Sequence, residues 1–386
     1  MQILDTICFK KLSLVLFLAL YFAGFGQRDY KGQTVDAKTG EPVPYVNIGI
    51  LDKGVGTVSD ENGIFHLPLE TSKYGNGDYI QISCLGYETI RIPVSKIEFE
   101  YNEYPKLILN PAEISLDEVE VTNTTLVPIK EYIGYQNNGS PSLGYWKDNV
   151  ALGGELATKI RTSKGPRQLN SLEFEVWSNP SDSILVRINV YDSDGPLGKP
   201  LTNLNKSGKD ILTTLTKGRG FKDVDLEPFI ISVTDDFYIS LELLKVYGDS
   251  EIELVLAAAD SDYGSYRKYT SQDKWQKVSD VNMAYYLETS PYVSQEKAKR
   301  YEVKVEKARR KLRMLSGFAI HNGSMLADVT VKNQRTRETT KTDDSGRYVI
   351  HAEKKDVIMF SKEGFKNMIL EGSDQQFANA LMRLID

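Results

Sequence analysis

The sequence is poor in the residues from which most catalytic and metal sites are built. Its 386 residues include 2 cysteines and 3 histidines. The histidines, His66, His321 and His351, form no pair with the spacing of zinc ligands. No GxSxG nucleophile elbow and no phosphate-binding glycine loop occurs. We therefore expect a non-enzymatic protein with no metal and no cofactor. The enzymatic alternative is a hydrolase whose acidic pair is brought together by the fold of the central region.

The scarcity of cysteine excludes an internal disulfide. Cys8 lies in an N-terminal segment that we expect to be removed, which leaves Cys84 as a single thiol. In the stretch YIQISCLGY, Cys84 shares one strand face with Ile80 and Ile82. We interpret Cys84 as a small buried side chain rather than a nucleophile, because no histidine stands beside it in the sequence.

The sequence also has no net excess of positive charge and few long apolar runs. The net charge of -6 and the pI of about 5.4 provide no basic surface for nucleic acid. One apolar run, LSLVLFLALYFAGF, follows Lys10 and Lys11 and ends in small residues. It is short for a membrane span, so we interpret residues 1–26 as a signal peptide, with a retained anchor as the alternative. We expect an exported protein of the periplasm, outer membrane or cell surface.

Short strands separated by turn signals fill residues 28–122. The stretch GTVSDENGIFHL has two strand-like ends around a polar corner. Asp60 can accept hydrogen bonds from backbone amides just after it, and Gly63 tolerates the positive φ that closes a hairpin. The pattern is typical of a β-sandwich.

This region resembles the carboxypeptidase regulatory-like domain, a transthyretin-like β-sandwich. The resemblance rests on GQTVDAKTGEPVPYVNIGI, GTVSDENGIFHL, DYIQISCLGYETIRIPV and LILNPAEISLDEVEVT. It implies a cell-envelope protein of Bacteroidetes-type bacteria, where such a domain often precedes a TonB-dependent receptor. SLDEVEVT resembles the segment that leads into the receptor plug. The rest of the chain is too short for a transporter barrel of about 22 strands, so we expect this chain not to be the transporter.

Residues 315–386 repeat the same pattern more weakly. Asp343 and Gly346 in TTKTDDSGRYVI follow Asp60 and Gly63 at one sequence offset, and LADVTV follows VPYVNI at the same offset. Gly364 likewise repeats Gly86 after one shorter loop. We expect a second regulatory-like domain here, with ANALMRLI as its last strand.

The central region, residues 123–293, shows alternating strands of a different kind. SLEFEVWS, SILVRINVYD and DDFYISLELL each place apolar residues on one face and polar residues on the other. This repetition favours a jelly-roll-like sandwich. DSDG, residues 192–195, resembles the start of a calcium loop, but Asn203 stands where the bidentate glutamate is required, so we interpret it as a turn.

The polar faces of the central strands provide the candidate ligand site. If LEFEVW and LVRINVY pair as a hairpin, Glu175 opposes Arg187 and Glu173 opposes Asn189, with Trp177 at the end of the face. An aromatic ring beside hydrogen-bonding charges suits a sugar. A solvated cross-strand ion pair is the alternative interpretation.

A second candidate lies in DYGSYRKYTSQDKW. Tyr263, Tyr266 and Trp275 fall in a turn-rich stretch where loops can present aromatic rings. Packing of these rings within strands is the alternative.

Residues 294–314 change character completely. SQEKAKRYEVKVEKARRKLRML has one apolar helical stripe, from Ala298 through Tyr301 and Val305 to Leu315, and its other faces are mostly basic. We expect a linker helix between two domains. Peripheral contact with anionic membrane lipid and a dimerising coil are the alternatives.

The sequence thus predicts an all-β protein with two transthyretin-like β-sandwiches flanking a central jelly-roll-like β-sandwich, plus one basic helix. We expect an exported cell-envelope binding or scaffolding protein whose partner is a glycan or another envelope protein. A carbohydrate-binding surface protein acting beside a TonB-dependent transporter is the alternative. Fold alone does not decide between these functions.

Overall fold

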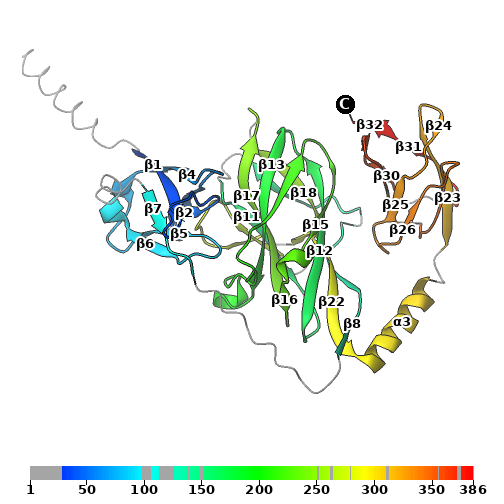
Figure 1. Ribbon diagram of the computed structural model, residues 1–386, viewed down its shortest axis with the longest axis horizontal. Coiled ribbons are helices and arrows are strands. Elements are labelled where there is room, and N and C mark those ends of the chain that lie inside the picture. Colours follow the sequence, from blue (N-terminus) through cyan, green and yellow to red (C-terminus); the bar gives the residue numbers. More distant parts are fainter. Residues whose placement is uncertain are drawn as a thin grey trace, which may run out of the picture.

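Three β-rich modules follow one another along the chain (Figure 1). The computed structural model describes residues 28–97, 106–112, 126–137, 139–147, 152–249, 252–260, 264–278, 280–309, 313–354, 356–371 and 375–385. The predicted signal peptide, the SLDEVEVT segment and Tyr263 lie outside these residues. No helix among the described residues is long and apolar enough to cross a membrane. The protein is mostly β, as the sequence predicted, and each module has its own apolar core.

The N-terminal module packs two sheets around one core. Its first sheet has the order β4-β1-β7 and its second the order β3-β2-β5-β6. The strands are β1 (Arg28–Asp36), β2 (Asn47–Ile50), β3 (Val55–Val58), β4 (Ile64–Leu69), β5 (Tyr79–Ser83), β6 (Ile90–Pro93) and β7 (Lys106–Leu109), with short 3-10 helices at Thr71–Lys73 and Val94–Lys96. Alternate residues of β4 and β5 point inward, and Phe65, Leu67, Ile80 and Ile82 are buried in the core.

The central module is a larger sandwich of a nine-stranded and a six-stranded sheet. The nine-stranded sheet contains β8 (Leu126–Pro128), β9 (Glu131–Gly134), β10 (Leu143–Lys147), β12 (Arg167–Ser178), β15 (Gly220–Asp225), β16 (Ser232–Val233), β18 (Glu253–Asp260), β21 (Val281–Met283) and β22 (Tyr286–Ser294). The six-stranded sheet contains β11 (Glu155–Ile160), β13 (Ser183–Asp192), β14 (Ile211–Thr216), β17 (Phe237–Tyr247), β19 (Ser265–Lys268) and β20 (Gln276–Val278). Two 3-10 helices, Pro196–Gly198 and Glu227–Phe229, lie in the connections.

The predicted hairpin of LEFEVW with LVRINVY is wrong. These segments are β12 and β13, which are consecutive in the chain but belong to opposite sheets. Both strands have an apolar face, and crossing between the sheets lets Phe174 and Ile188 enter the same core from opposite sides. Buried Asn179 organises the crossing, because its side-chain amide donates to the carbonyls of Leu215 and Thr216. Glu175 therefore lies opposite Phe221 of β15, not Arg187.

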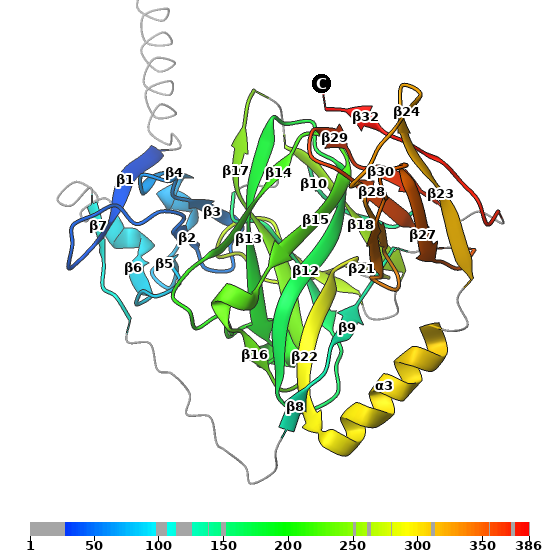
Figure 2. The ribbon, with the colours of Figure 1, turned by 45° about the vertical axis from the view of Figure 1, so that its right-hand side comes forward.

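The linker helix α3 (Gln295–Arg309) directly follows β22 and runs from the central module to the C-terminal module (Figures 1 and 2). Ala298 is buried and Tyr301 is half-buried where the helix packs on β22 and β8. Val305 is exposed, so the predicted stripe is not packed along its whole length. The predicted helix was also too long, because Met314 begins a strand and Leu315 is buried in the C-terminal core.

The C-terminal module again packs two sheets around one core. The first sheet has the order β24-β23-β27, with β31 also beside β23, and the second has the order β26-β25-β28-β30. The short strands β29 and β32 form a separate two-stranded sheet. The strands are β23 (Met314–His321), β24 (Ser324–Met325), β25 (Thr330–Asn333), β26 (Thr339–Lys341), β27 (Arg347–His351), β28 (Ile358–Ser361), β29 (Phe365–Lys366), β30 (Met368–Leu370), β31 (Ala380–Leu381) and β32 (Arg383–Leu384).

The two end modules have matching strand pairings. β27-β23-β31 corresponds to β4-β1-β7, and β31 and β7 are each parallel to their neighbour. β26-β25-β28-β30 corresponds to β3-β2-β5-β6. One supporting hydrogen bond also recurs, because the Ser59 hydroxyl accepts from the Val46 amide at 2.8 Å and the Thr342 hydroxyl accepts from the Val329 amide at 2.8 Å.

The polar corner has the same geometry in both modules. Asp60 Oδ1 accepts from the amides of residues 62 and 64, and Asp343 Oδ1 accepts from the amides of residues 345 and 347. Gly63 and Gly346 have φ angles of 72° and 74°, in the left-handed region. A Cβ at Gly63 would also lie 2.5 Å from the Thr34 carbonyl oxygen. Both corners therefore require glycine.

We predict that Gly63→Ala and Gly346→Ala each destabilise their own module by at least about 1–2 kcal/mol, the cost of a left-handed conformation for a residue with a Cβ. Hydrogen–deuterium exchange during urea titration would locate the loss in the mutated module. Gly75→Ala is the control, because nothing lies within 4 Å of a Cβ there, and it should change stability by less than about 0.5 kcal/mol. Equal effects of all three substitutions would contradict the role of the two corners.

Candidate functional site

The predicted site residues separate onto the two opposite sheets of the central sandwich. Arg187, Asn189, Tyr266 and Trp275 belong to the six-stranded sheet and its loops. The others, Glu173, Glu175 and Trp177, belong to β12 of the nine-stranded sheet. The structure therefore divides the single predicted surface into two faces, each of which meets an end module.

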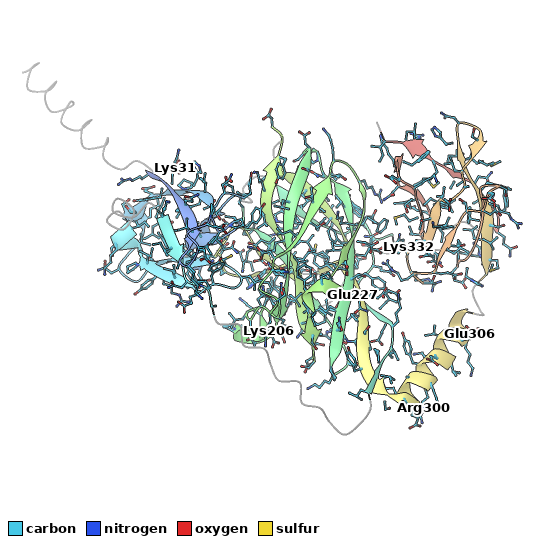
Figure 3. The ribbon with its side chains drawn as sticks, in the orientation of Figure 1. Lys31, Lys206, Glu227, Arg300, Glu306 and Lys332 are labelled. Atoms are coloured by element: carbon cyan, nitrogen blue, oxygen red, sulfur yellow. The ribbon has the colours of Figure 1, made fainter. Side chains whose placement is uncertain are left out.

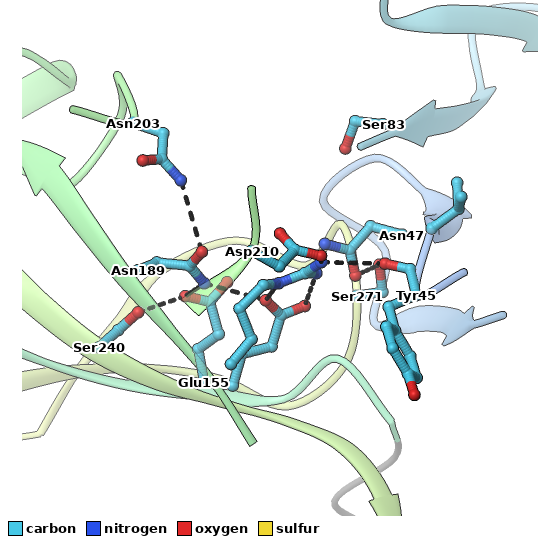
Figure 4. A network of polar contacts seen from close by, with 12 residues as sticks. Tyr45, Asn47, Ser83, Glu155, Asn189, Asn203, Asp210, Ser240 and Ser271 are labelled. Atoms are coloured by element: carbon cyan, nitrogen blue, oxygen red, sulfur yellow. Dashed lines mark hydrogen bonds and ion pairs between the residues drawn. The ribbon is translucent and has the colours of Figure 1, made fainter. Parts of the chain in front are cut away.

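A buried polar network on the six-stranded sheet includes Glu155, Asn189 and Ser240 (Figure 4). Arg187 lies at its centre. Its guanidinium donates to both carboxylate oxygens of Glu242, at 2.8 and 3.0 Å, and to Asp210 at 3.0 Å. Asn189 donates to Glu242 at 2.9 Å, and Ser240 donates to Glu155 at 2.7 Å. Charged groups that are removed from water need such partners, because otherwise the cost of desolvation exceeds the gain from electrostatic attraction.

The pKa values in this network follow from burial and pairing. Burial opposes ionisation of both Glu242 and Arg187, but their mutual attraction and hydrogen bonds outweigh it. The pKa of Glu242 is consequently lowered and that of Arg187 is raised. Burial also raises the pKa of Tyr191, whose hydroxyl donates to Glu155 at 3.1 Å. Glu242 and Arg187 are therefore a fixed charge pair at neutral pH.

The same network reaches the N-terminal module. Arg187 also donates to the carbonyl oxygen of Tyr45 at 3.0 Å. Around it, the loop after β19 follows the edge of the module: Ser271 donates to Asn47 at 2.9 Å and Gln272 donates to Ser83 at 2.8 Å. The face that was predicted to be open to ligand is thus covered by this module.

Two glycines allow this close contact. A Cβ at Gly49 or Gly56 would lie 2.7 or 2.2 Å from the carbonyl oxygen of Ser271. Any larger residue at either position would push the β19 loop away from the module. Val58, Leu185 and Leu244 add a small apolar cluster between the two modules.

Cys84 borders this interface as an unreactive thiol. Burial, followed by the nearby Asp210 charge, raises its pKa to about 12. At neutral pH the side chain is protonated, whereas a nucleophilic cysteine needs its thiolate.

The aromatic residues of the second predicted candidate pack within the fold. Trp275 meets Tyr191 edge to face, with ring centroids 6.0 Å apart, and the Lys268 ammonium lies 4.3 Å from the Trp275 centroid. Lys268 also pairs with Glu155 at 3.2 Å. Tyr266 packs edge to face on Tyr238. For Tyr266 and Trp275 the contacts agree with the alternative interpretation, in which the rings stabilise the sheet.

On the opposite sheet, Glu173 binds the C-terminal module. Lys332 of β25 donates to Glu173 at 2.9 Å and to Asp223 of β15 at 3.0 Å. Arg337, in the β25–β26 turn, pairs with the same two carboxylates and lies within 6 Å of the ring centroids of Tyr132 and Tyr286. Figure 3 shows Lys332 on the side of the C-terminal module that faces the central sheets.

Glu175 and Trp177 continue this face away from the ion pairs. Arg219 donates to one oxygen of Glu175 at 2.8 and 3.0 Å and lies 5.9 Å from the Trp177 ring centroid. The indole Nε1 of Trp177 is buried and has no hydrogen-bond partner. The charge pair predicted for Glu175 therefore exists, but its partner is Arg219 instead of Arg187.

A cavity of about 870 Å³ lies between this face and the C-terminal module. The central module contributes Glu173, Glu175, Phe221 and Tyr286, and the C-terminal module contributes Gln334 and Asp356, among others. Binding sites for small molecules commonly lie between domains and have this size. The cavity is the candidate functional site.

The acidic DSDG segment, which resembles the start of a calcium loop but was interpreted as a turn, does not form a metal site. In DSDG, the Asp194 carboxylate accepts from the hydroxyl and amide of Thr202, which lowers its pKa and closes the loop. Among the residues that the structure describes, no three His, Cys, Asp or Glu side chains could hold a metal ion together. The DSDG segment is a turn.

Sequence reasoning missed the partners of Glu173. Lys332 and Arg337 stand more than a hundred residues away from it, and only the docking of two modules brings them together. A signal did exist, because the β25–β26 hairpin alternates cations with polar residues in KNQRTR while β12 carries paired acids in LEFEV. Complementary charge identifies such faces but does not assign one to the other.

Comparison with known families identifies the N-terminal module. Residues 30–121 match the model of the CarboxypepD_reg-like domain. The chain therefore contains this domain, as its sequence pattern indicated. No curated protein matches the sequence.

Comparison with solved structures gives distant similarities. The cysteine protease and lectin-like domains of Cwp84 from Clostridium difficile share 13% identity at a TM-score of 0.28, over 39% of this chain and 36% of that chain. The major pilin subunit BcpA of Bacillus cereus shares 9% identity at a TM-score of 0.15, over 92% and 98%. Carbohydrate-binding modules of the β-sandwich superfamily share 6% identity at 0.16, over 60% and 95%. These scores are too low to support a function.

We predict that Arg187→Met lowers the free energy of unfolding by about 3–5 kcal/mol, because it leaves Glu242 buried without its cation. Since the pKa of Glu242 is lowered in the folded chain, the pair stabilises fully above the ordinary value of 4.5 and loses this contribution as the pH falls through the folded value. Urea denaturation of wild type and variant between pH 3 and 7 measures both effects.

Arg300→Ala is the matched control for this measurement. Its ion pair with Glu296 lies on the exposed surface of α3, so its loss should cost less than about 1 kcal/mol. Similar losses for the two arginines would show that the Arg187 network does not hold the sheet and the N-terminal module together.

Proposed function

We propose that the protein is an exported, non-enzymatic binding or scaffolding protein of the cell envelope. In this proposal the central sandwich holds the two end modules in fixed positions. The partner is a glycan or another envelope protein. The CarboxypepD_reg-like domain and the β-sandwich architecture support a structural role, and the function beyond that is our inference.

The observation that carries the proposal is that both polar faces of the central sandwich are covered. The Arg187 network lies against the N-terminal module, and the Glu173 ion pairs lie against the C-terminal module. A chain of freely jointed modules would leave these charges hydrated. Direct pairing between modules favours one rigid unit, which suits a scaffold.

We further propose that residues 315–386 are a second regulatory-like domain. The matching strand pairings and the matching aspartate–glycine corner support this assignment. Two related modules at the ends would then present the same type of fold on opposite sides of one spacer. The resemblance stated from the sequence supports a Bacteroidetes-type envelope as the location of the protein.

We predict that reversing the charges of Lys332 and Arg337 releases the C-terminal module. The double variant Lys332→Glu with Arg337→Glu puts like charges against Glu173 and Asp223, and small-angle X-ray scattering should show a larger radius of gyration. Lys341→Glu is the control, since its contact with Asp328 is exposed and 3.7 Å long. An unchanged radius in the double variant would refute the rigid scaffold.

We also predict that the protein isolated from its producing cells is found in the envelope fraction and begins at Gln27, because the apolar segment before it has the features of a signal peptide. N-terminal sequencing of the fractionated protein provides the measurement. Recovery from the cytoplasm with Met1 in place would rule out export.

A further inference from the structure

We infer that the cavity between the central and C-terminal modules binds an uncharged oligosaccharide. The inference deepens the proposed function, since it rests on the docking of these two modules and names the ligand class. Three features of the cavity carry it: an unsatisfied buried donor, aromatic rings and charges that are already paired.

The unsatisfied donor is the side-chain amide of Gln334. Gln334 lines the cavity and is 5% exposed, and its Nε2 atom has no hydrogen-bond partner. Its other groups are fixed: Oε1 accepts from Arg337 at 3.2 Å, and the carbonyl oxygen accepts from Gln136 at 2.6 Å. A buried donor without a partner is costly, so an acceptor on a ligand would satisfy it.

Aromatic rings supply the apolar part of the site. Phe221, Tyr286 and Tyr135 line the cavity and are each half-buried. Tyr286 also stacks on Tyr132, with ring centroids 5.8 Å apart, and has Arg337 5.5 Å from its centroid. A half-buried ring such as that of Phe221 keeps a surface that a ligand can cover. The axial C–H groups of a pyranose form a flat apolar face, which packs well on such a ring.

The buried charged groups of the cavity favour an uncharged ligand, whereas Glu353, Lys354 and Glu371, which also line it, are exposed to solvent. Glu173 is neutralised by Lys332 and Arg337, and Glu175 is neutralised by Arg219. Both oxygens of Asp356 are likewise occupied, by Arg335 and Asn333. A charged ligand would have to compete with these pairs, whereas hydroxyl groups can add hydrogen bonds to them at no such cost.

Together these features define a ligand with hydroxyl groups on its rim, an apolar face and no net charge. A cavity of about 870 Å³ is large enough for several sugar units rather than one. The oligosaccharide class meets each requirement, whereas a metal ion or a phosphate meets none of them.

Isothermal titration calorimetry with the full chain tests the inference. The probes are cellotetraose, xylotetraose, mannotetraose and maltotetraose, with tetragalacturonate as an acidic probe and the tetramer of glucosamine as a basic one. We expect at least one neutral probe to bind with a Kd of about 0.01–1 mM, and neither charged probe to bind more tightly. Absence of binding by all four neutral probes, or tighter binding of a charged one, would overturn the inference.

Gln334→Glu is the diagnostic variant, because it keeps the oxygen that faces Arg337 and removes the free donor. Affinity for the neutral probe should fall by about tenfold or more. Gln376→Glu makes the same chemical change at an exposed position of the same module and should bind normally. Unaltered affinity of Gln334→Glu would show that the sugar does not occupy this cavity.

Scattering measurements separate failure of the inference from failure of the scaffold. If Gln334→Glu and the wild type are equally compact and neither binds a neutral probe, the scaffold stands and the sugar site does not. If the wild type is already extended, the docking itself is wrong. Binding that is lost in the extended double variant of Lys332 and Arg337 would assign the site to the seam between the modules.

Discussion

Charged side chains on the two outer faces of the central sandwich are the constraint on which the arrangement of the protein depends. A sandwich core can bury only the inward face of each strand, and here the outward faces carry carboxylates and arginines as well as neutral polar groups. Glu242 and Glu173 are almost fully buried, which is stable only where cations meet them. Arg187 supplies the cation within one sheet, whereas Lys332 and Arg337 supply it from another module. The charge pattern of the strands and the docking of the modules therefore depend on each other.

This arrangement leaves less of the two polar faces open to a ligand. The most polar strand faces, which look like recognition surfaces when taken alone, are used to hold the end modules. Space for a ligand remains at the seam, where β12 and β15 meet the C-terminal module over rings and paired charges. The linker helix contacts the central module near its start, through Ala298 and Tyr301, and the ion pairs of Lys332 and Arg337 hold the C-terminal module against the same sheet.

The end modules show how a few residues can specify a repeated architecture. The aspartate that accepts two backbone amides and the glycine with positive φ recur in both, and both are required by local geometry. Strand order then follows, because the apolar positions on either side of the corner must reach one core. Glycines at positions 49 and 56 have a different role, which is to let the central β19 loop approach the N-terminal module. Local sequence predicts the first kind of glycine but not the second.

The order of the residues was sufficient to predict the all-β class, the inward faces of β12, β13 and β17, and the turn chemistry of both corners. Each of these depends on alternation or on contacts within a few residues, which are visible in the order of the residues. Only the tertiary structure decided that β12 and β13 belong to opposite sheets, that Glu175 meets Arg219, and that Glu173 meets Lys332 and Arg337. The chain can bury the apolar faces of two successive strands either by forming a hairpin in one sheet or by crossing to the opposite sheet. Charges of opposite sign can pair at any separation along the chain. Only the packing of the whole molecule selects among those options.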